Sequence, residues 1–123
     1  MKKLMSFFLV ISIISITYSC KKAVAPTVST GSATNVQYQT ATTAGSVDNN
    51  GGGTVSERGF VYSNVQSVTI GGTYVKQAIS GSGDGAFTSD LTGLSPSTTY
   101  YYKAYAINEA GTSYGEEKTF TTL

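Results

Sequence analysis

Residues 94–108, with the sequence LSPSTTYYYKAYAIN, decide the fold of this chain. From Tyr100 onward the side chains alternate between the two faces of an extended strand. One face carries Tyr100, Tyr102, Ala104 and Ala106, and the other carries Tyr101, Lys103, Tyr105 and Ile107. Small alanines beside large tyrosines allow facing layers to interdigitate. The Tyr100 face is therefore predicted to line the core of a two-layer β structure.

The body of the chain from Thr27 onward consists of short alternating runs separated by turn residues, the pattern of a β-sandwich or barrel. Residues 48–53, DNNGGG, predict a turn because Gly and Asn accept positive φ at low cost. Glycines bracket the run 73–79, which we expect to form an irregular edge strand. Strands are predicted at 27–32, 40–47, 55–63, 73–79, 85–91, 99–108 and 114–122.

The segment 94–100, followed by Ala104, Ala106, Asn108 and Gly111, resembles the late-strand signature of fibronectin type III domains. The segments 51–60, 85–89 and 114–122 are similar to divergent repeats of bacterial surface lipoproteins, so the resemblance covers about residues 27–122. It implies an all-β, seven-stranded antiparallel immunoglobulin-like (fibronectin type III) β-sandwich over 27–123. It also implies a tyrosine corner built from Leu94, Pro96 and Tyr100, in which the tyrosine hydroxyl bonds to backbone just upstream.

One departure from this resemblance concerns the second strand, where many such domains carry a tryptophan. The chain contains no tryptophan. Thr42, Ala44 or another small residue is expected to occupy that space, which predicts a thinner core at this point.

The N-terminal region reads as a secretory signal peptide over residues 1–19, preceding the sandwich. Lys2 and Lys3 are followed by a mainly apolar stretch from Leu4 to Ile16. This stretch is shorter than the roughly 20 residues of a membrane-spanning helix, and it fits the apolar region of a signal peptide. The alternative, a buried core helix, is disfavoured because the stretch has no alternating polar face.

Cys20 is the only cysteine in the chain and stands where cleavage would fall. The segment 16–20, ITYSC, resembles a bacterial lipoprotein box, which implies that Cys20 is lipidated and holds the mature protein to a membrane. Residues 20–26 would then form the lipidated tether. The alternative is a free or intermolecularly paired thiol, since a lone cysteine cannot form an internal disulfide.

The residues after Cys20 bear on the location of the protein. Lys21 rather than Asp follows the cysteine, which by resemblance to Gram-negative lipoproteins favours the outer membrane, on its periplasmic or its cell-surface side. Lys21 and Lys22 would lie near lipid head groups or form an ordinary solvated pair. In a seven-stranded sandwich the loops 48–54 and 109–113 lie at the same end as the N-terminus. Because the tether is short, we expect these loops to face the membrane and Leu123 to point away.

The composition argues against an enzyme and against a cofactor. The chain has no histidine and one cysteine, so zinc and haem sites and Ser-His-Asp or Cys-His catalysis are not expected. Charged residues make up 12% of the chain with a net charge of +1, which gives no footprint for nucleic acid. A pair of carboxylates could in principle act together, and the candidates are Asp48, Glu57, Asp84, Asp90, Glu109, Glu116 and Glu117.

Two local motifs resemble ligand-binding loops, but we interpret both as turns. Asp84 lies in a glycine-rich loop with Asp90 further on, yet calcium needs six to eight oxygen ligands, so a turn-stabilising aspartate is the favoured interpretation. Gly51–Gly53 lacks the lysine and helix of a phosphate loop and reads as a hairpin loop.

The outward stripe of Tyr101, Lys103 and Tyr105 is the candidate binding face. Tyrosines on a solvent-facing sheet are common at recognition surfaces, although sheet propensity alone also produces such stripes. The function predicted is non-catalytic binding or adhesion of a protein or glycan ligand by a membrane-anchored module. The alternative is a structural spacer or assembly subunit without a ligand. Replacing Tyr101 and Tyr105 by serine is expected to separate the two roles.

Overall fold

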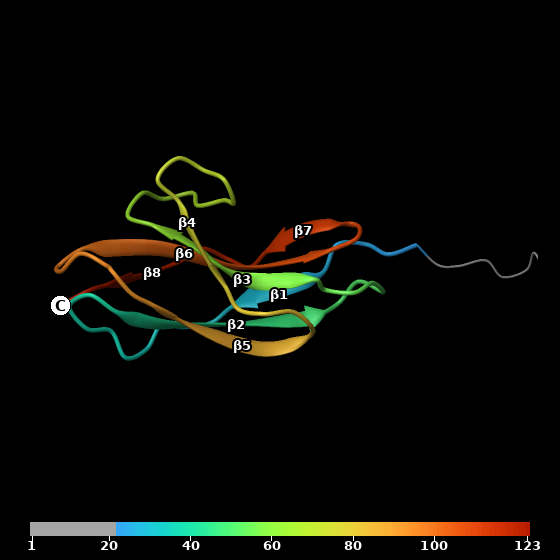
Figure 1. The fold of residues 1–123 in the computed structure, drawn as a ribbon, viewed down its shortest axis with the longest axis horizontal. Helices are drawn as coiled ribbons and strands as arrows, with labels where there is room; N and C mark the ends of the chain where they lie inside the picture. The colour runs from blue at the N-terminus through green and yellow to red at the C-terminus, as the bar shows by residue number, and fades with distance from the viewer. Residues whose placement is uncertain (1–21) are drawn as a thin grey trace, which may run out of the picture.

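The computed structural model describes residues 22–123, so the predicted signal peptide and Cys20 lie outside the described residues. Two antiparallel sheets pack face to face (Figure 1). The three-stranded sheet has the order β1-β2-β5, and the five-stranded sheet has the order β4-β3-β6-β7 with β8 also paired to β6. The strands are β1 Thr27–Thr30, β2 Ala41–Asn49, β3 Glu57–Ser63, β4 Lys76–Ile79, β5 Gly85–Leu91, β6 Thr99–Asn108, β7 Gly111–Tyr114 and β8 Lys118–Thr121. The prediction of an all-β, two-layer sandwich is confirmed.

The last predicted strand, 114–122, is divided in the structure into β7 and β8, both paired to β6. The cause is Thr30 of β1, whose Oγ1 accepts the N–H of Ala104 over 3.1 Å. The carbonyl of Ala104 accepts the N–H of Gly115 over 2.9 Å. The N–H of Ala104 is thus bonded to a side chain of the other sheet. The hydrogen-bond ladder that joins β6 to β7 and β8 is interrupted at this residue.

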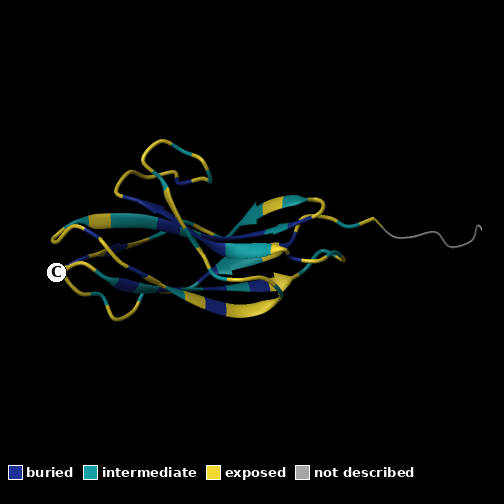
Figure 2. Ribbon diagram, in the orientation of Figure 1, coloured by how far each residue is buried: buried dark blue, intermediate teal, exposed yellow. Residues whose placement is uncertain are grey.

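The main core lies between the two sheets, where the described chain is buried along the facing sides of the strands (Figure 2). Phe60 of β3 and Phe87 of β5 meet across the layers with ring centroids 5.1 Å apart. Tyr102 is fully buried, and its hydroxyl donates a 2.6 Å hydrogen bond to the carbonyl of Gly31. Aromatic side chains from both sheets therefore supply most of the volume of this core.

Of the small residues expected to fill the space of the missing tryptophan, the two that were named do not point inward, and other small residues do. Thr42 and Ala44 are only half-buried, and the inward residues of β2 are instead Ala41, Thr43, Gly45 and Val47. A Cβ atom at Gly45 would lie 2.7 Å from the Cβ of Ala104. The two sheets approach each other at this glycine, so close contact rather than a bulky ring closes the core.

A second hydrophobic cluster lies on the outer face of the five-stranded sheet. The loop between β3 and β4, residues 64–75, folds over this face and places Val68 against Val61 and Tyr105. Figure 1 shows the loop standing beside β4 and β6. The outer face is therefore partly covered by the chain itself.

The N-terminal segment and the C-terminal residue lie at opposite ends of the sandwich. At one end the N–H of Val24 donates to the carbonyl of Gly51, and Asn108 Nδ2 donates to the carbonyls of Val24 and Asn50 over 2.7 and 2.9 Å. Leu123 lies at the opposite end (Figure 1), where its carbonyl accepts the N–H of Ser97. The predicted grouping of the 48–54 and 109–113 loops with the N-terminal segment, away from Leu123, is confirmed.

Candidate functional site

The turn into β6 carries the arrangement of a tyrosine corner. The hydroxyl of Tyr100 accepts a 2.8 Å hydrogen bond from the N–H of Ser95, five residues upstream. Its ring stacks on Phe120 with centroids 5.6 Å apart, and Leu94 is buried beside it. Pro96 is exposed at the tip of the turn, and its carbonyl accepts a 2.8 Å hydrogen bond from Thr98 Oγ1. This turn is held rigidly because side chains and backbone both fix it.

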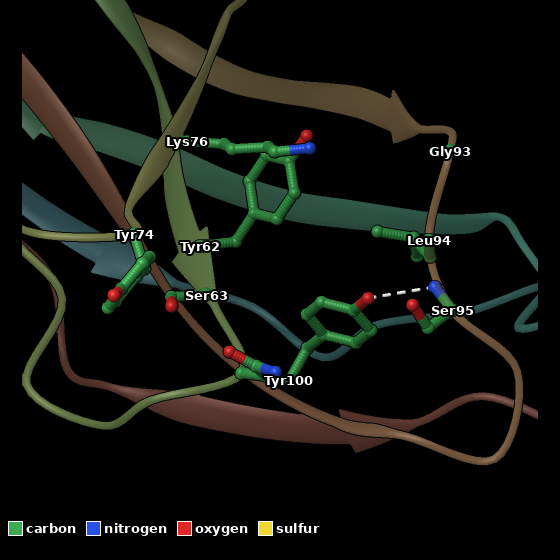
Figure 3. A pocket seen from close by; sticks show the side chains of 9 residues that line it. Tyr62, Ser63, Tyr74, Lys76, Gly93, Leu94, Ser95 and Tyr100 are labelled. Carbon is green, nitrogen blue, oxygen red and sulfur yellow. Dashed lines mark hydrogen bonds between the residues drawn. The ribbon is translucent and has the colours of Figure 1, made fainter.

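A cavity of about 190 Å³ opens beside this corner, at the end of the sandwich that holds Leu123. Its walls come from the distal end of β3, the start of β4, the turn before β6 and the loop 64–75 (Figure 3). The lining residues are Tyr62, Ser63, Asn64, Tyr74, Lys76, Gly93, Leu94, Ser95 and Tyr100. Five of the nine carry hydroxyl groups, so the cavity is suited to a polar ligand.

The back of the cavity is formed by two tyrosines from neighbouring strands. Tyr62 is 8% exposed, and burial together with the nearby Tyr100 raises its pKa. In Figure 3 the Tyr100 hydroxyl points toward Ser95, whereas the Tyr62 hydroxyl points toward the end of the Lys76 side chain. Lys76 pairs with Tyr62 across β3 and β4, and its side chain extends over the tyrosine ring. An ammonium group and two phenols therefore belong to the lining of one cavity.

Tyr74 forms the outer wall of the cavity and has an unusual backbone. Its side chain is 80% exposed, and its φ is 63°. It follows Gly72 in a turn closed by the bond from the Val75 N–H to the Gly72 carbonyl. Positive φ is costly for a bulky residue, and such strain gathers at ligand-binding sites. The turn thus presents an aromatic ring to solvent beside the cavity.

The binding face predicted from sequence is placed differently from the expectation. Tyr105 is fully buried beneath the loop 64–75, so its predicted exposure is wrong. Tyr101 is half-buried against the same cluster. Lys103 is also half-buried, with its Nζ 5.3 Å from the centre of the Tyr114 ring. Serine at position 105 would empty a core position, so the Tyr101/Tyr105 pair is no clean test of binding.

The predicted carboxylates are dispersed, and most bond to nearby backbone or side chains. Glu117 accepts the N–H groups of Ser67 and Val68 over 3.1 and 2.9 Å. Glu109 accepts the N–H of Thr54 over 2.7 Å, and backbone N–H groups lower its pKa. These carboxylates stabilise loops, which explains their positions next to strand ends.

The two aspartates considered for calcium lie at either end of β5. Asp84 accepts a bond from Asn50 Nδ2 and Asp90 one from Thr42 Oγ1. Six residues of strand place them about 20 Å apart, too far to share an ion. Within residues 22–123 no group of three or more acidic or cysteine side chains could hold a metal. Among the same residues no helix is long and apolar enough to cross a membrane.

Sequence reasoning found Leu94 and Tyr100 but missed Tyr74 and Lys76. Both fall in the run 73–79 that was predicted as one strand, whereas β4 begins only at Lys76. The glycines at 71 and 72 were the available signal, because a glycine pair two residues before an aromatic residue indicates a turn rather than a strand at that point.

Comparison with known proteins finds similar structures at low sequence identity. No protein-family description matches the chain, and no curated protein matches it. The sensor domain of the anti-sigma factor RsgI4 from Pseudobacteroides cellulosolvens is similar, with a TM-score of 0.61 at 19% identity over 83% of this chain and 98% of that one. A fourth fibronectin type III domain from human gives 0.62 at 16% identity, covering 87% of each chain. A fibronectin type III domain of human collagen XX gives 0.53 at 18% identity, over 85% of this chain and all 100% of that one. The chain thus has a fibronectin type III-like fold.

Proposed function

We propose that the mature chain is an extracytoplasmic lipoprotein, attached to the outer membrane through Cys20, whose sandwich is a non-catalytic binding module. The observation that carries this proposal is that the cavity and the attachment of the N-terminal segment lie at opposite ends of β6. Tyr100, at the cavity, and Asn108, which binds the N-terminal segment, are eight residues apart on this strand. At about 3.3 Å per residue, the strand separates them by about 26 Å.

The tether supports a fixed orientation of the module. Val24 is hydrogen-bonded to the body through Gly51 and Asn108. Only Lys21, Lys22 and Ala23 stand between it and Cys20, which allows at most about 14 Å of reach. A lipid at Cys20 would therefore hold the end with the 48–54 loop near the membrane and direct the cavity outward.

Lipid attachment is tested by metabolic labelling with an alkyne fatty acid, comparing the native chain with Cys20→Ser. Fatty acid is expected on the native chain only. A native chain without label, recovered as a soluble thiol or a disulfide-linked dimer, would support the free-cysteine alternative and overturn the anchor.

Ser82 lies in the loop between β4 and β5, which is bonded to the 48–54 loop through Asp84 and Asn50. Orientation is tested with single cysteines at Asn50, Ser82 and Leu123 and an impermeant maleimide on whole cells or opened envelopes. Leu123→Cys is expected to react faster than Asn50→Cys and Ser82→Cys. Equal rates at the three positions would contradict the outward direction of the cavity. Labelling only after opening the envelope would assign the protein to the periplasmic side.

A further inference from the structure

We infer that the cavity beside Tyr100 binds a sugar ring that carries a carboxylate, the chemistry of a uronic acid. This inference deepens the proposed binding role, and it rests on the cavity alone rather than on lipid attachment.

The size of the cavity limits the ligand to a small group. Its volume is about 190 Å³. Pockets for drug-sized ligands are larger, about 300–1,000 Å³. One ring, at the end or along the edge of a longer chain, is therefore the unit that the cavity can hold.

The polar groups of the cavity suit a polyhydroxylated ring better than a peptide. Hydroxyl side chains provide most of the polar lining. Because the Tyr100 hydroxyl accepts its bond from Ser95, its own proton stays available to a ligand. Tyr62 adds a second phenol to the lining. Such groups can each donate and accept, as the hydroxyls of a sugar require.

Tyr74 supplies an apolar platform at the mouth. The C–H face of a pyranose stacks on an aromatic ring, and this ring is exposed and already positioned by its turn. A tyrosine provides this area at low entropy cost because it has only two side-chain torsions.

Lys76 determines the charge of the ligand. It is the only charged residue among those that line the cavity, and it has no carboxylate beside it in that lining. A carboxylate on the ring would form a charge-assisted hydrogen bond with this ammonium group. A cationic amino sugar would meet repulsion, and a neutral sugar would gain no bond between opposite charges from the lysine.

The purified mature protein is titrated with D-glucuronate and short galacturonate oligomers, and in parallel with glucose, galactose, glucosamine and an acidic tripeptide. Amide NMR shifts report the site, and tyrosine fluorescence reports affinity because the chain contains no tryptophan. We expect uronates to shift the resonances of Tyr74, Lys76 and Ser95, and to bind about tenfold or more tightly than neutral sugars, as a hydrogen bond to a charged group implies.

Two exposed positions provide variants that leave the core intact. Lys76→Gln is expected to abolish the preference for uronates over neutral sugars, and Tyr74→Ala to weaken both. Tyr38→Ala, which removes a tyrosine that is 64% exposed and outside the cavity lining, is the matched control and is expected to bind as the native protein does.

Equal binding by Lys76→Gln, or tighter binding of the acidic tripeptide than of the uronates, would overturn the inference. Absence of any uronate binding would also overturn it while leaving the lipid anchor standing. A native chain that takes up no fatty acid in the labelling experiment but still binds glucuronate would retain this site and refute the anchor alone.

Discussion

The Tyr105 hydroxyl donates a 2.7 Å hydrogen bond to Glu57 Oε2, and Gln77 Nε2 donates to both oxygens over 2.8 and 2.9 Å. Three strands of the five-stranded sheet thus meet in one closed triangle. The Tyr105 ring is fully buried while its hydroxyl reaches the half-exposed Glu57. Through this triangle the Tyr105 hydroxyl is hydrogen-bonded, although its ring lies beneath the loop that covers the outer face.

This triangle predicts a loss of stability at alkaline pH. Burial raises the pKa of Tyr105 to about 12 from its ordinary value of 10.0, with the bond to Gln77 opposing and Glu57 adding to the rise. The unfolded chain then loses this proton at lower pH than the folded chain. Stability from this group is complete below pH 10 and falls as the pH rises toward 12.

Urea denaturation between pH 8 and pH 12 measures this effect, with Tyr105→Phe as the control because it keeps the ring and removes the titrating group. The alkaline slope of the unfolding free energy is expected to be shallower in Tyr105→Phe. Parallel slopes in the two proteins would contradict the role assigned to this hydroxyl.

The tyrosine corner makes a second prediction. Tyr100→Phe removes the acceptor of the Ser95 N–H and is expected to lower the unfolding free energy by about 1 kcal/mol. Stacking on Phe120 is retained, so the fold should persist. Urea denaturation of Tyr100→Phe against Tyr38→Phe, an exposed tyrosine, gives the comparison. A loss of equal size in both variants would show that the hydroxyl of the tyrosine corner contributes no more to stability than an exposed tyrosine hydroxyl does.

The strand period made much of the fold readable from sequence. Alternation along 99–108 correctly assigned Tyr102 and Ala104 to the core, because a strand exposes its faces with a period of two residues. The same alternation misassigned Tyr105, since a period shows which residues share a face but not what covers it. The covering loop 64–75 has few local signals, and its contact with Tyr105 is a long-range one.

The candidate site was predictable only in part for the same reason. Leu94 and Tyr100 belong to one local motif, and the sequence of that motif predicts the position of both. Lys76 joins them only because β4 pairs with β3 and brings it beside Tyr62. Long-range register of this kind depends on the whole sheet, so short sequence windows do not contain it.

Asn108 makes a third prediction about the attachment of the N-terminal segment. Its Oδ1 accepts the N–H groups of Ala110 and Gly111 over 2.8 and 3.1 Å, while its Nδ2 binds the carbonyls of Val24 and Asn50. Asn108→Ala is expected to lower the unfolding free energy by about 2 kcal/mol or more, because these partners lose a buried amide.

Asn108→Asp separates the two sets of hydrogen bonds that this side chain makes, since it keeps the acceptor and removes the donors. Hydrogen exchange is expected to stay slow at Ala110 and Gly111 and to become faster at Val24, whose amide donates to Gly51. Fast exchange at all three amides, or at none, would show that the side-chain amide does not hold this segment.

The contact between Gly45 and Ala104 predicts a size-dependent coupling between the sheets. A Cβ at position 45 would lie 2.7 Å from the Cβ of Ala104, 3.2 Å from the carbonyl oxygen of Ser29 and 3.3 Å from the Phe60 ring. Gly45→Ala is therefore expected to destabilise the protein by about 1–3 kcal/mol through overpacking. Removing the opposing methyl with Ala104→Gly should recover part of this loss in the double variant, because the shortest of the three contacts is then relieved.

A double-mutant cycle by urea denaturation measures the coupling, which is expected to be at least about 0.5 kcal/mol and favourable. Recovery should be incomplete, because the Ser29 carbonyl and the Phe60 ring remain close and glycine at position 104 weakens a central strand. Strictly additive losses would mean that the sheets move apart to admit the methyl. The absence of a tryptophan would then not be explained by close approach at Gly45.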